Sequence, residues 1–257
     1  MKRKSIVLMM TILLMTGVIR VAAATPFDHS RFDQILHQYV NDKGRVDYNG
    51  IAANPTFKAY IKSLESADID AEPINEQLAF WLNVYNAVTI DKVIKWKPKK
   101  SVRETLFPGV WTATKFFTTR KHTVAGKRLS QDDIEHNILR KQFKDPRIHF
   151  AIICASSGCP PQPRFAYTED NVQTKLEEET RKYINSQRGI RIDYAENTLY
   201  LSKLFDWFAG DFEFKAGSVL GFVKPYLSED VRVFLERKPK MAYIHYDWSL
   251  NAQEPLK

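Results

Sequence analysis

The stretch QLAFWLNVYNAVTIDKVI, residues 77–94, is apolar around most of the circumference of a helix. It predicts a helix over about residues 74–96, and a helix that is apolar on nearly every side is buried at the centre of its domain. The stretch also carries two amides, Asn83 and Asn86. A buried amide without hydrogen bonds costs about 1–3 kcal/mol. These side chains are therefore expected to clasp neighbouring loops, and Asn86 is also a candidate supporting residue of a functional site.

Other helical patterns lie on both sides of this stretch. Apolar residues at helical spacing, a capping pair at Asn54 and Pro55 and a capping box at Ser130 and Asp133 mark their positions. Helices are predicted at about residues 27–42, 54–64, 134–143 and 168–185, and as short segments between 204 and 237.

Strand patterns occur mainly in the second half of the chain. Apolar, β-branched and aromatic residues bounded by turns predict strands at 111–129, 148–154 and 241–246 and a hairpin at 190–202. Helices early and strands late indicate an α+β fold rather than alternating β–α–β units. Since no repeat or long linker divides the chain, we expect one domain over residues 25–257, with N-terminal helices packed on a mainly antiparallel sheet.

The first 24 residues have the pattern of a secretory signal peptide. Basic residues at positions 2–4 precede an apolar stretch at 6–19, and an alanine run at 22–24 predicts cleavage before Thr25. The apolar stretch is shorter than the ~20 residues that a membrane-spanning helix needs. We therefore expect a mature chain with no transmembrane segment, located in the periplasm or secreted.

The composition is that of an ordinary globular protein, with 44% hydrophobic residues, 26% charged residues and two cysteines among 257 residues. It argues against disordered, collagen-like, disulfide-framework and multi-span membrane proteins. Without the predicted signal peptide, 34 basic residues remain against 30 acidic ones. The basic excess is concentrated in residues 92–128, called here the basic segment, which hold eleven Lys or Arg residues and one acid.

The basic segment has two open interpretations, an anion-binding surface or a solvated basic face. Interleaved aromatic residues, such as Trp96 and Trp111, favour a surface that attracts anions. The candidate anion-binding residues are Lys97, Lys99, Lys100 and Arg103. In an exported protein the expected partner is an anionic envelope component, such as a lipid headgroup or a cell-wall polymer, and not nucleic acid.

The stretch RIHFAIICASSGCPPQP, residues 147–163, places both cysteines after a predicted strand. Cys154 and Cys159 have four open interpretations: a disulfide, a nucleophile activated by a histidine, part of a metal site with His149, or inert buried thiols. The irregular spacing and the missing fourth ligand disfavour the metal site. Motifs for nucleotide phosphates, zinc proteases, α/β-hydrolases and thioredoxin-type redox exchange are also missing. We expect no metal and no cofactor.

Two histidines are candidate bases for a reactive thiol. In a regular strand His149 and Cys154 would point to opposite faces and lie about 16 Å apart, so His149 is expected only in a supporting role. His136 lies on the preceding predicted helix beside Glu135 and is the preferred base. The alternative interpretation of His136 is a solvated or helix-capping residue.

A second polar cluster stands at the end of the last predicted strand. His245 and Asp247 are two residues apart, so they share a strand face and are able to enter one site. The alternative is that His245 and Asp247 are polar surface residues that flank a buried Trp248. Asp206 and Asp211 are expected to cap short helices.

Four stretches carry a family resemblance: FWLNVYNA (80–87), DIEHNILR (133–140), HFAIICASSGCPP (149–161) and YDWSLN (246–251). Together they resemble the signature of the "domain of unknown function 547" family over nearly the whole mature chain. The resemblance implies a bacterial exported member of a family also found in plants, with no settled activity. It implies a cysteine matching Cys154 in almost all members, whereas plant members carry serine at the position of Cys159. Cys154 is then the expected functional thiol, with His136 and Glu135 as the matching motif residues.

The first hypothesis is a papain-like or transglutaminase-like thiol hydrolase or acyltransferase that acts on an amide or ester of a peptide-like substrate. Cys154 would attack the carbonyl carbon and His136 would act as the base. Glu135 or Asp247 would orient that histidine. Backbone amides at 155–158 would supply an oxyanion hole.

The second hypothesis is a non-catalytic envelope-binding module. It has a structural Cys154–Cys159 disulfide and uses the basic segment as a docking face. A third hypothesis, thiol redox exchange, is disfavoured because the two cysteines lack the C-x-x-C spacing.

Overall fold

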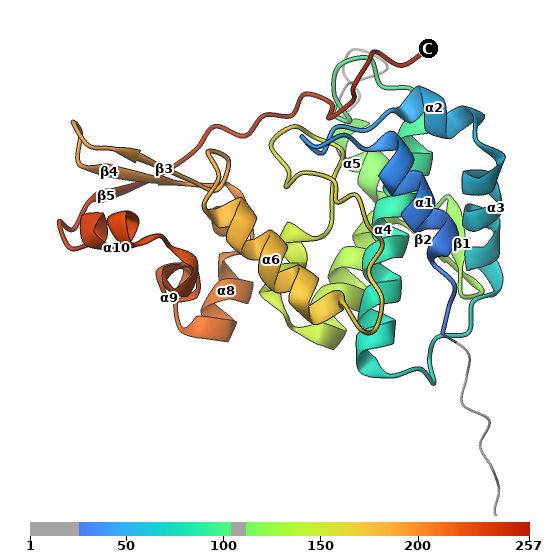
Figure 1. Ribbon diagram of the computed structural model, residues 1–257, viewed down its shortest axis with the longest axis horizontal. Helices are drawn as coiled ribbons and strands as arrows, with labels where there is room; N and C mark the ends of the chain where they lie inside the picture. Colours follow the sequence, from blue (N-terminus) through green and yellow to red (C-terminus); the bar gives the residue numbers. More distant parts are fainter. Residues whose placement is uncertain (1–25, 104–111) are drawn as a thin grey trace, which may run out of the picture.

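Helix α4 (Ile74–Trp96) runs through the middle of the helical half of the molecule, drawn in teal in Figure 1. The computed structural model describes residues 26–103 and 112–257. Every residue of α4 from Leu78 to Val93 is buried. The predicted central helix is confirmed, because neighbours pack on all of its faces and shield its apolar surface.

Helices from distant parts of the chain surround α4. Those in contact with it are α2 (Tyr48–Ala53), α3 (Pro55–Ser63), α6 (Val172–Ile184) and the π-helix η2 (Asp133–Phe143). Helix α1 (Ser30–Tyr39) packs on α2 and α3, and the 3-10 turn η1 (Leu64–Ser66) follows α3. The predicted capping box before η2 is confirmed, because the N–H of Asp133 donates to Ser130 Oγ and the N–H of Ser130 donates to Asp133 Oδ2, both at 3.0 Å.

Two small sheets complete the α+β fold. Strands β1 (His122–Val124) and β2 (Lys127–Leu129) form an antiparallel pair. Strands β3 (Ile190–Asp193) and β4 (Thr198–Leu201) form the predicted antiparallel hairpin, and β5 (Lys240–Tyr243) joins β4 in parallel. The three-stranded sheet lies at the opposite end of the molecule from α1, α2 and α3 (Figure 1). The fold class is confirmed, with the N-terminal helices gathered around α4 and the larger sheet in a separate layer.

That larger sheet belongs to a second hydrophobic core, drawn in orange and red in Figure 1. The predicted short helices build it: α7 (Leu204–Trp207), α8 (Ala209–Ala216), α9 (Val219–Val223), the 3-10 turn η4 (Lys224–Tyr226) and α10 (Glu229–Leu235). Its centre is aromatic, with Phe150, Phe205, Phe212 and Phe222 buried against one another. The molecule therefore has two adjoining cores, one around α4 and one beside the sheet.

Two predicted strands are wrong. The first part of the 111–129 prediction is helix α5 (Thr112–Thr118), and only its end pairs, as β1 and β2. The 148–154 prediction is a 3-10 turn, η3 (Pro146–Phe150), followed by irregular backbone. A short apolar run does not distinguish a buried strand from other buried structure. Here side chains and distant backbone, rather than neighbouring strands, satisfy the peptide groups.

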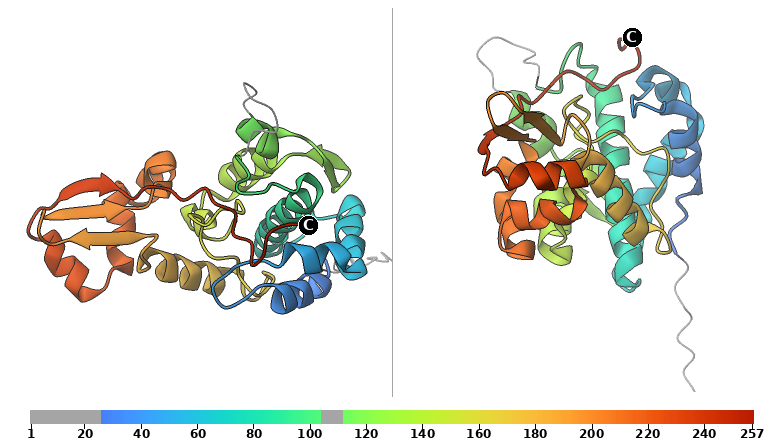
Figure 2. Two further views of the ribbon diagram at one scale, coloured as in Figure 1. Left: turned by 90° about the horizontal axis from the view of Figure 1, so that it is seen from above. Right: turned by 60° about the vertical axis from the view of Figure 1, so that its left-hand side comes forward.

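The C-terminal strap, residues 244–257, crosses from the sheet back to the N-terminal helices (Figures 1 and 2). Its backbone bonds to the cysteine-bearing segment and to the chain between α1 and α2. The N–H of Asn251 donates to Ala155 O at 3.0 Å, and the N–H of Val46 donates to Asn251 O at 2.9 Å. The N–H of Gln253 returns a bond to Val46 O at 2.9 Å. The strap thereby ties the segment that carries the cysteines to the first helices of the fold.

Candidate functional site

A cavity of about 470 Å³ lies between the two cores. Tyr85 and Ile152 reach it from the core around α4, and Leu204 and Tyr246 reach it from the core beside the sheet. The other lining residues are Arg103, Phe117, Thr118, Asp132, Glu135, His136, His149, Cys154, Cys159, Trp207, Phe208 and Trp248. This volume suits a small molecule or a short piece of a polymer.

Five of the predicted catalytic and supporting residues line this one cavity, as does the candidate anion-binding residue Arg103: the five are Glu135, His136, His149, Cys154 and Cys159. They come from η2, from η3 and from the irregular segment that follows η3. The sequence therefore identified the residues that meet, although two of its arguments about their geometry fail.

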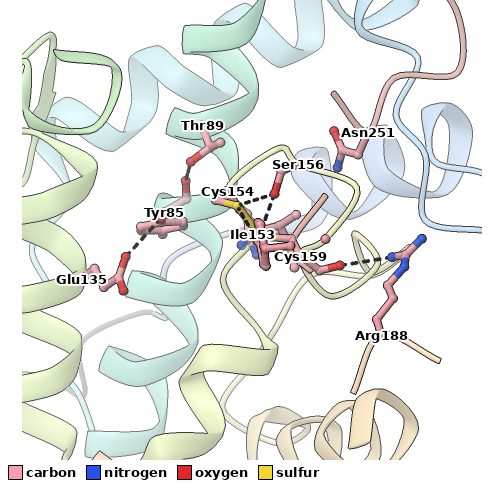
Figure 3. Close-up of a disulfide and its surroundings, with 12 residues drawn as sticks. Tyr85, Thr89, Glu135, Ile153, Cys154, Ser156, Cys159, Arg188 and Asn251 are labelled. Atoms are coloured by element: carbon pink, nitrogen blue, oxygen red, sulfur yellow. Dashed lines mark hydrogen bonds between the residues drawn. A yellow bond between two sulfur atoms is a disulfide. The ribbon is translucent and has the colours of Figure 1, made fainter. Parts of the chain in front are cut away.

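Cys154 and Cys159 form a disulfide beside the cavity, with Cα atoms 6.3 Å apart (Figure 3). Cys159 is buried, whereas Cys154 is partly exposed. The Tyr246 hydroxyl lies 3.3 Å from each sulfur and 2.9 Å from Ser156 Oγ. The disulfide, one of the four interpretations open from the sequence, is thus packed against Tyr246 while it borders the cavity.

Asn86 holds the cysteine-bearing segment from behind. Its amide nitrogen donates to Ala151 O at 2.9 Å, and its amide oxygen accepts from the N–H of Ile153 at 2.8 Å. Asn83, one turn earlier on α4, makes the same pair of bonds to the backbone of Tyr167. The predicted clasps are confirmed, and Asn86 positions the segment without lining the cavity.

The C-terminal strap holds the same segment from the other side. The N–H groups of Ser157 and Gly158 donate to Ser249 O and Asp247 O, both at 2.7 Å. A side chain at Gly158 would place its Cβ 2.9 Å from the Asp247 backbone nitrogen, so only glycine allows this approach. Ala155 has a φ of 65°, a left-handed conformation that is costly for alanine. The predicted oxyanion hole is wrong for Ser157 and Gly158, because the strap already accepts from their N–H groups.

Glu135 is one of two acidic residues that line the cavity, with Asp132. The Tyr85 hydroxyl donates to its Oε2 at 3.2 Å, and Figure 3 shows the Tyr85 ring between this carboxylate and the disulfide. Burial raises the pKa of Glu135 to about 7. Burial also raises the pKa of Tyr85 well above its usual value, so this hydroxyl stays a donor. At neutral pH Glu135 is therefore poised between its acid and its carboxylate.

His136 is held by charged neighbours on its own helix. Its Nδ1 lies 2.9 Å from Arg140 Nη1, and its Nε2 lies 3.4 Å from Asp132 Oδ1. Burial lowers the pKa of His136. Arg140 and Asp132, rather than the Glu135 predicted for this role, orient the ring.

His149 is brought to the cavity by the 3-10 turn that replaces the predicted strand. Its Nε2 lies 2.8 Å from Asp211 Oδ2, and Arg140 binds both oxygens of Asp211 at 2.7 and 2.8 Å. The expected separation of about 16 Å from Cys154 assumed extended backbone, so that argument is corrected by the structure. Asp211 does not act as the predicted helix cap, because it joins His149 to Arg140.

Three aromatic rings gather at one side of the cavity. Trp207, Tyr246 and Trp248 lie with ring centroids 4.6–5.6 Å apart. The Arg103 guanidinium carbon lies 4.4 Å from the centroid of the Trp248 ring. Alternation along a predicted strand would turn Tyr246 away from its neighbours His245 and Asp247, which is why the sequence argument missed this residue.

The other predicted site residues lie elsewhere. His245 and Asp247 line a smaller pocket of about 210 Å³, and Asp247 accepts from the N–H of Ser249 at 2.9 Å. Lys97, at the C-terminal cap of α4, has a left-handed backbone. The lining of the cavity includes Arg103 but not the three candidate lysines Lys97, Lys99 and Lys100.

Part of the basic segment is used inside the protein. Lys92 is buried, donates to Gln131 Oε1 at 2.9 Å and lies over the Trp96 ring. Lys95 pairs with Asp91 at 2.6 Å. Trp111 lies outside the described residues, as does the predicted signal peptide. The segment is therefore not a uniform docking face over its described part.

Residues 26–103 and 112–257 carry neither a metal-binding cluster nor a membrane-spanning helix. In these ranges no group of three or more His, Cys, Asp or Glu side chains is arranged to hold a metal ion. Nor does any helix in them have the length and apolar character required to cross a bilayer.

The family model described as "Protein of unknown function, DUF547" matches residues 70–184. Over this segment the chain is similar to the DUF547 family. The match runs from α4 through α6 and includes both cysteines, Glu135, His136 and His149. No curated protein and no solved structure matches the chain. The resemblance to papain-like or transglutaminase-like folds stays a prediction.

Proposed function

We propose that this protein is an exported, cysteine-dependent hydrolase or acyltransferase that acts on an amide or ester. The observation that carries the proposal is the shared cavity, in which Cys154 borders the same space as Glu135, His136 and His149. A nucleophile, titratable groups and an apolar binding surface around one cavity are what acyl transfer requires. The aromatic cluster of Trp207, Tyr246 and Trp248 would hold the apolar part of the substrate.

The disulfide is the resting form in this proposal. A dithiol reductant supplies two electrons and two protons, so that Cys154 and Cys159 become thiols and the reductant becomes a disulfide. The Cys154 thiolate then attacks the substrate carbonyl carbon, a C–S bond forms, and the C–N or C–O bond breaks. The leaving amine or alcohol takes up the proton of the thiol. Water or an acceptor amine or alcohol next attacks the thioester, and the C–S bond breaks to release the thiolate.

The test is acylation of the full-length exported protein by a p-nitrophenyl ester, followed by intact mass and peptide mapping. We expect an acyl adduct on Cys154 after treatment with dithiothreitol and none before it. Cys159→Ser leaves Cys154 unpaired and should be acylated without reductant, whereas Cys154→Ser should not be acylated at either position. A reduced protein that releases nitrophenol no faster than Cys154→Ser, and carries no adduct, would refute the proposal.

The second candidate function is the non-catalytic envelope-binding module. The disulfide favours it, because Tyr246 packs against both sulfurs as it would in a structural crosslink. The measurement is co-sedimentation with phosphatidylglycerol vesicles and with cell-wall sacculi at low and high salt. We expect binding that salt weakens and that is lost when Lys97, Lys99 and Lys100 are changed to Glu. Unchanged binding by this triple variant would remove the basis of this function.

A further inference from the structure

We infer that His149, held by Asp211, is the proton acceptor for the Cys154 thiol, in place of His136. The inference deepens the proposed function and rests on it. It starts from the hydrogen bonds of the two histidines that line the cavity.

The tautomer of His149 follows from its partner. Arg140 donates to both oxygens of Asp211. Although burial opposes the shift, the hydrogen bonds from His149 and Arg140 hold the pKa of Asp211 well below its usual value. An ionised carboxylate only accepts, so Nε2 of His149 must carry the proton that bridges the 2.8 Å to Asp211 Oδ2. The lone pair of the neutral ring then lies on Nδ1.

Nδ1 of His149 is buried and has no hydrogen-bond partner among the described residues. The residue as a whole is 2% exposed, although it lines the cavity. An acceptor that is buried without a hydrogen bond is unfavourable. A group bound or generated in the cavity is the partner that this nitrogen lacks.

The surroundings keep the ring fixed and neutral. Phe208 stacks on it, with centroids 3.9 Å apart and planes 18° apart, and Phe212 flanks it. Burial lowers the pKa of His149. Asp211 acts to raise this pKa, whereas Arg140 and His136 act to lower it further. Asp211, Arg140 and His136 are the charged or titratable neighbours that shift this pKa, and Glu135 and Asp132 line the same cavity. At neutral pH the lone pair is therefore available.

His136 offers no equivalent acceptor. The guanidinium of Arg140 only donates, so the 2.9 Å contact uses the lone pair on His136 Nδ1. Nε2 of His136 then carries the proton and faces Asp132 Oδ1 at 3.4 Å. Both ring nitrogens of His136 are thus engaged, whereas one nitrogen of His149 is not.

The proton step uses these groups as follows. After reduction of the disulfide, the S–H bond of Cys154 breaks and its proton passes to His149 Nδ1, which leaves a thiolate and an imidazolium. Asp211 stabilises the imidazolium through Nε2. When the C–N or C–O bond of the substrate breaks, the imidazolium returns the proton to the leaving nitrogen or oxygen.

The experiment measures the rate of Cys154 alkylation by iodoacetamide against pH in a Cys159→Ser background. We expect a thiol pKa below the ~8.5 of a free cysteine. His149→Gln should raise it and slow alkylation at pH 7 about tenfold, which corresponds to a pKa change of one unit. His136→Gln, which removes the competing candidate base, should shift the thiol pKa less than His149→Gln does.

Asp211→Asn provides a second variant in case His149→Gln does not fold, and it should raise the thiol pKa in the same direction. A pH profile that His149→Gln and Asp211→Asn leave unchanged, or that His136→Gln shifts instead, would overturn the inference. The readout does not depend on turnover. A thiol pKa that depends on His149, in a protein that forms no acyl adduct, would defeat the proposed function while the inference stands.

Discussion

Helix α4 and the segment 146–161 are both strongly apolar, yet they become buried in opposite ways. Helix α4 satisfies its own peptide groups, and its burial from Leu78 to Val93 is continuous. The segment 146–161 makes one 3-10 turn, and then its peptide groups bond to Asn86 and to the C-terminal strap. A helix needs only neighbours that cover it, whereas this segment needs particular partners. That dependence lets the segment adopt irregular backbone, and the irregular backbone places His149 and Cys154 on one cavity.

The largest expected effect comes from cutting the link between these two regions. Asn86→Ala would leave the carbonyl of Ala151 and the N–H of Ile153 buried without partners, which should reduce the free energy of unfolding by about 3 kcal/mol. Denaturant unfolding and amide exchange would measure this. Asn83→Ala is the matched control: it should cost a similar amount while leaving exchange at 151–154 unchanged. Equal exchange in both variants would show that the clasp does not hold the segment.

Glu135, which lies on η2 and accepts a hydrogen bond from Tyr85 of α4, should make the stability of the protein depend on pH. Glu135 titrates near 4.5 when unfolded and at about 7 when folded, so the folded state binds more protons between these values. The contribution of Glu135 to the free energy of unfolding is therefore greatest below pH 4.5, and it is lost as the pH rises through about 7. Glu135→Gln should remove this loss, so that its stability falls by about 3 kcal/mol less than that of the parent between pH 4.5 and pH 8. Urea unfolding at both pH values measures it, and parallel pH profiles of the two proteins would count against the assignment.

Removing the disulfide should loosen the segment 146–161 but not α4. Cys154→Ala with Cys159→Ala opens a loop of a few residues, which should cost about 2 kcal/mol. Faster amide exchange is expected around 153–159 and not in the middle of α4. The oxidised parent and the reduced parent serve as controls in the same measurement. Exchange that increases equally in both regions would mean that they unfold together.

The smallest effect is expected from the hydroxyl of Tyr246. Tyr246→Phe keeps the ring and removes contacts with Ser156 and both sulfurs, so it should cost about 1 kcal/mol. It should also make the disulfide easier to reduce, as followed by thiol release during titration with dithiothreitol. If the stability of the variant and the ease with which dithiothreitol reduces its disulfide are both unchanged, then packing of the Tyr246 ring, and not its hydroxyl, stabilises the disulfide.

The sequence predicted most elements because their signals are local. The continuous apolar run predicted α4 with its observed bounds, and the capping box at Ser130 and Asp133 marked the start of η2. The two false strands were short runs of apolar and β-branched residues, whose secondary structure depends on the available partners. Segment 148–154 found a partner in Asn86, and the strap holds residues 155–158 that follow it, so no adjacent strand was needed.

For the candidate site, residue types and motif proximity were sufficient to name Cys154, Glu135 and His136, which do line one cavity. The pairing of His149 with Asp211 could not be predicted, because 62 residues separate them and the contact depends on how the two cores adjoin. The position of Tyr246 likewise depends on the path of the C-terminal strap.

By itself, the sequence determined the α+β class, the central helix α4 and the resemblance to the DUF547 family, since these follow from periodicity, capping and motifs read along the chain. Only the tertiary structure decided which histidine has an unpaired nitrogen, that the cysteines pair, and which backbone amides the strap occupies. The physical reason is that hydrogen bonds and burial at the cavity involve groups far apart in the chain, and their geometry is set only when the two cores and the strap come together.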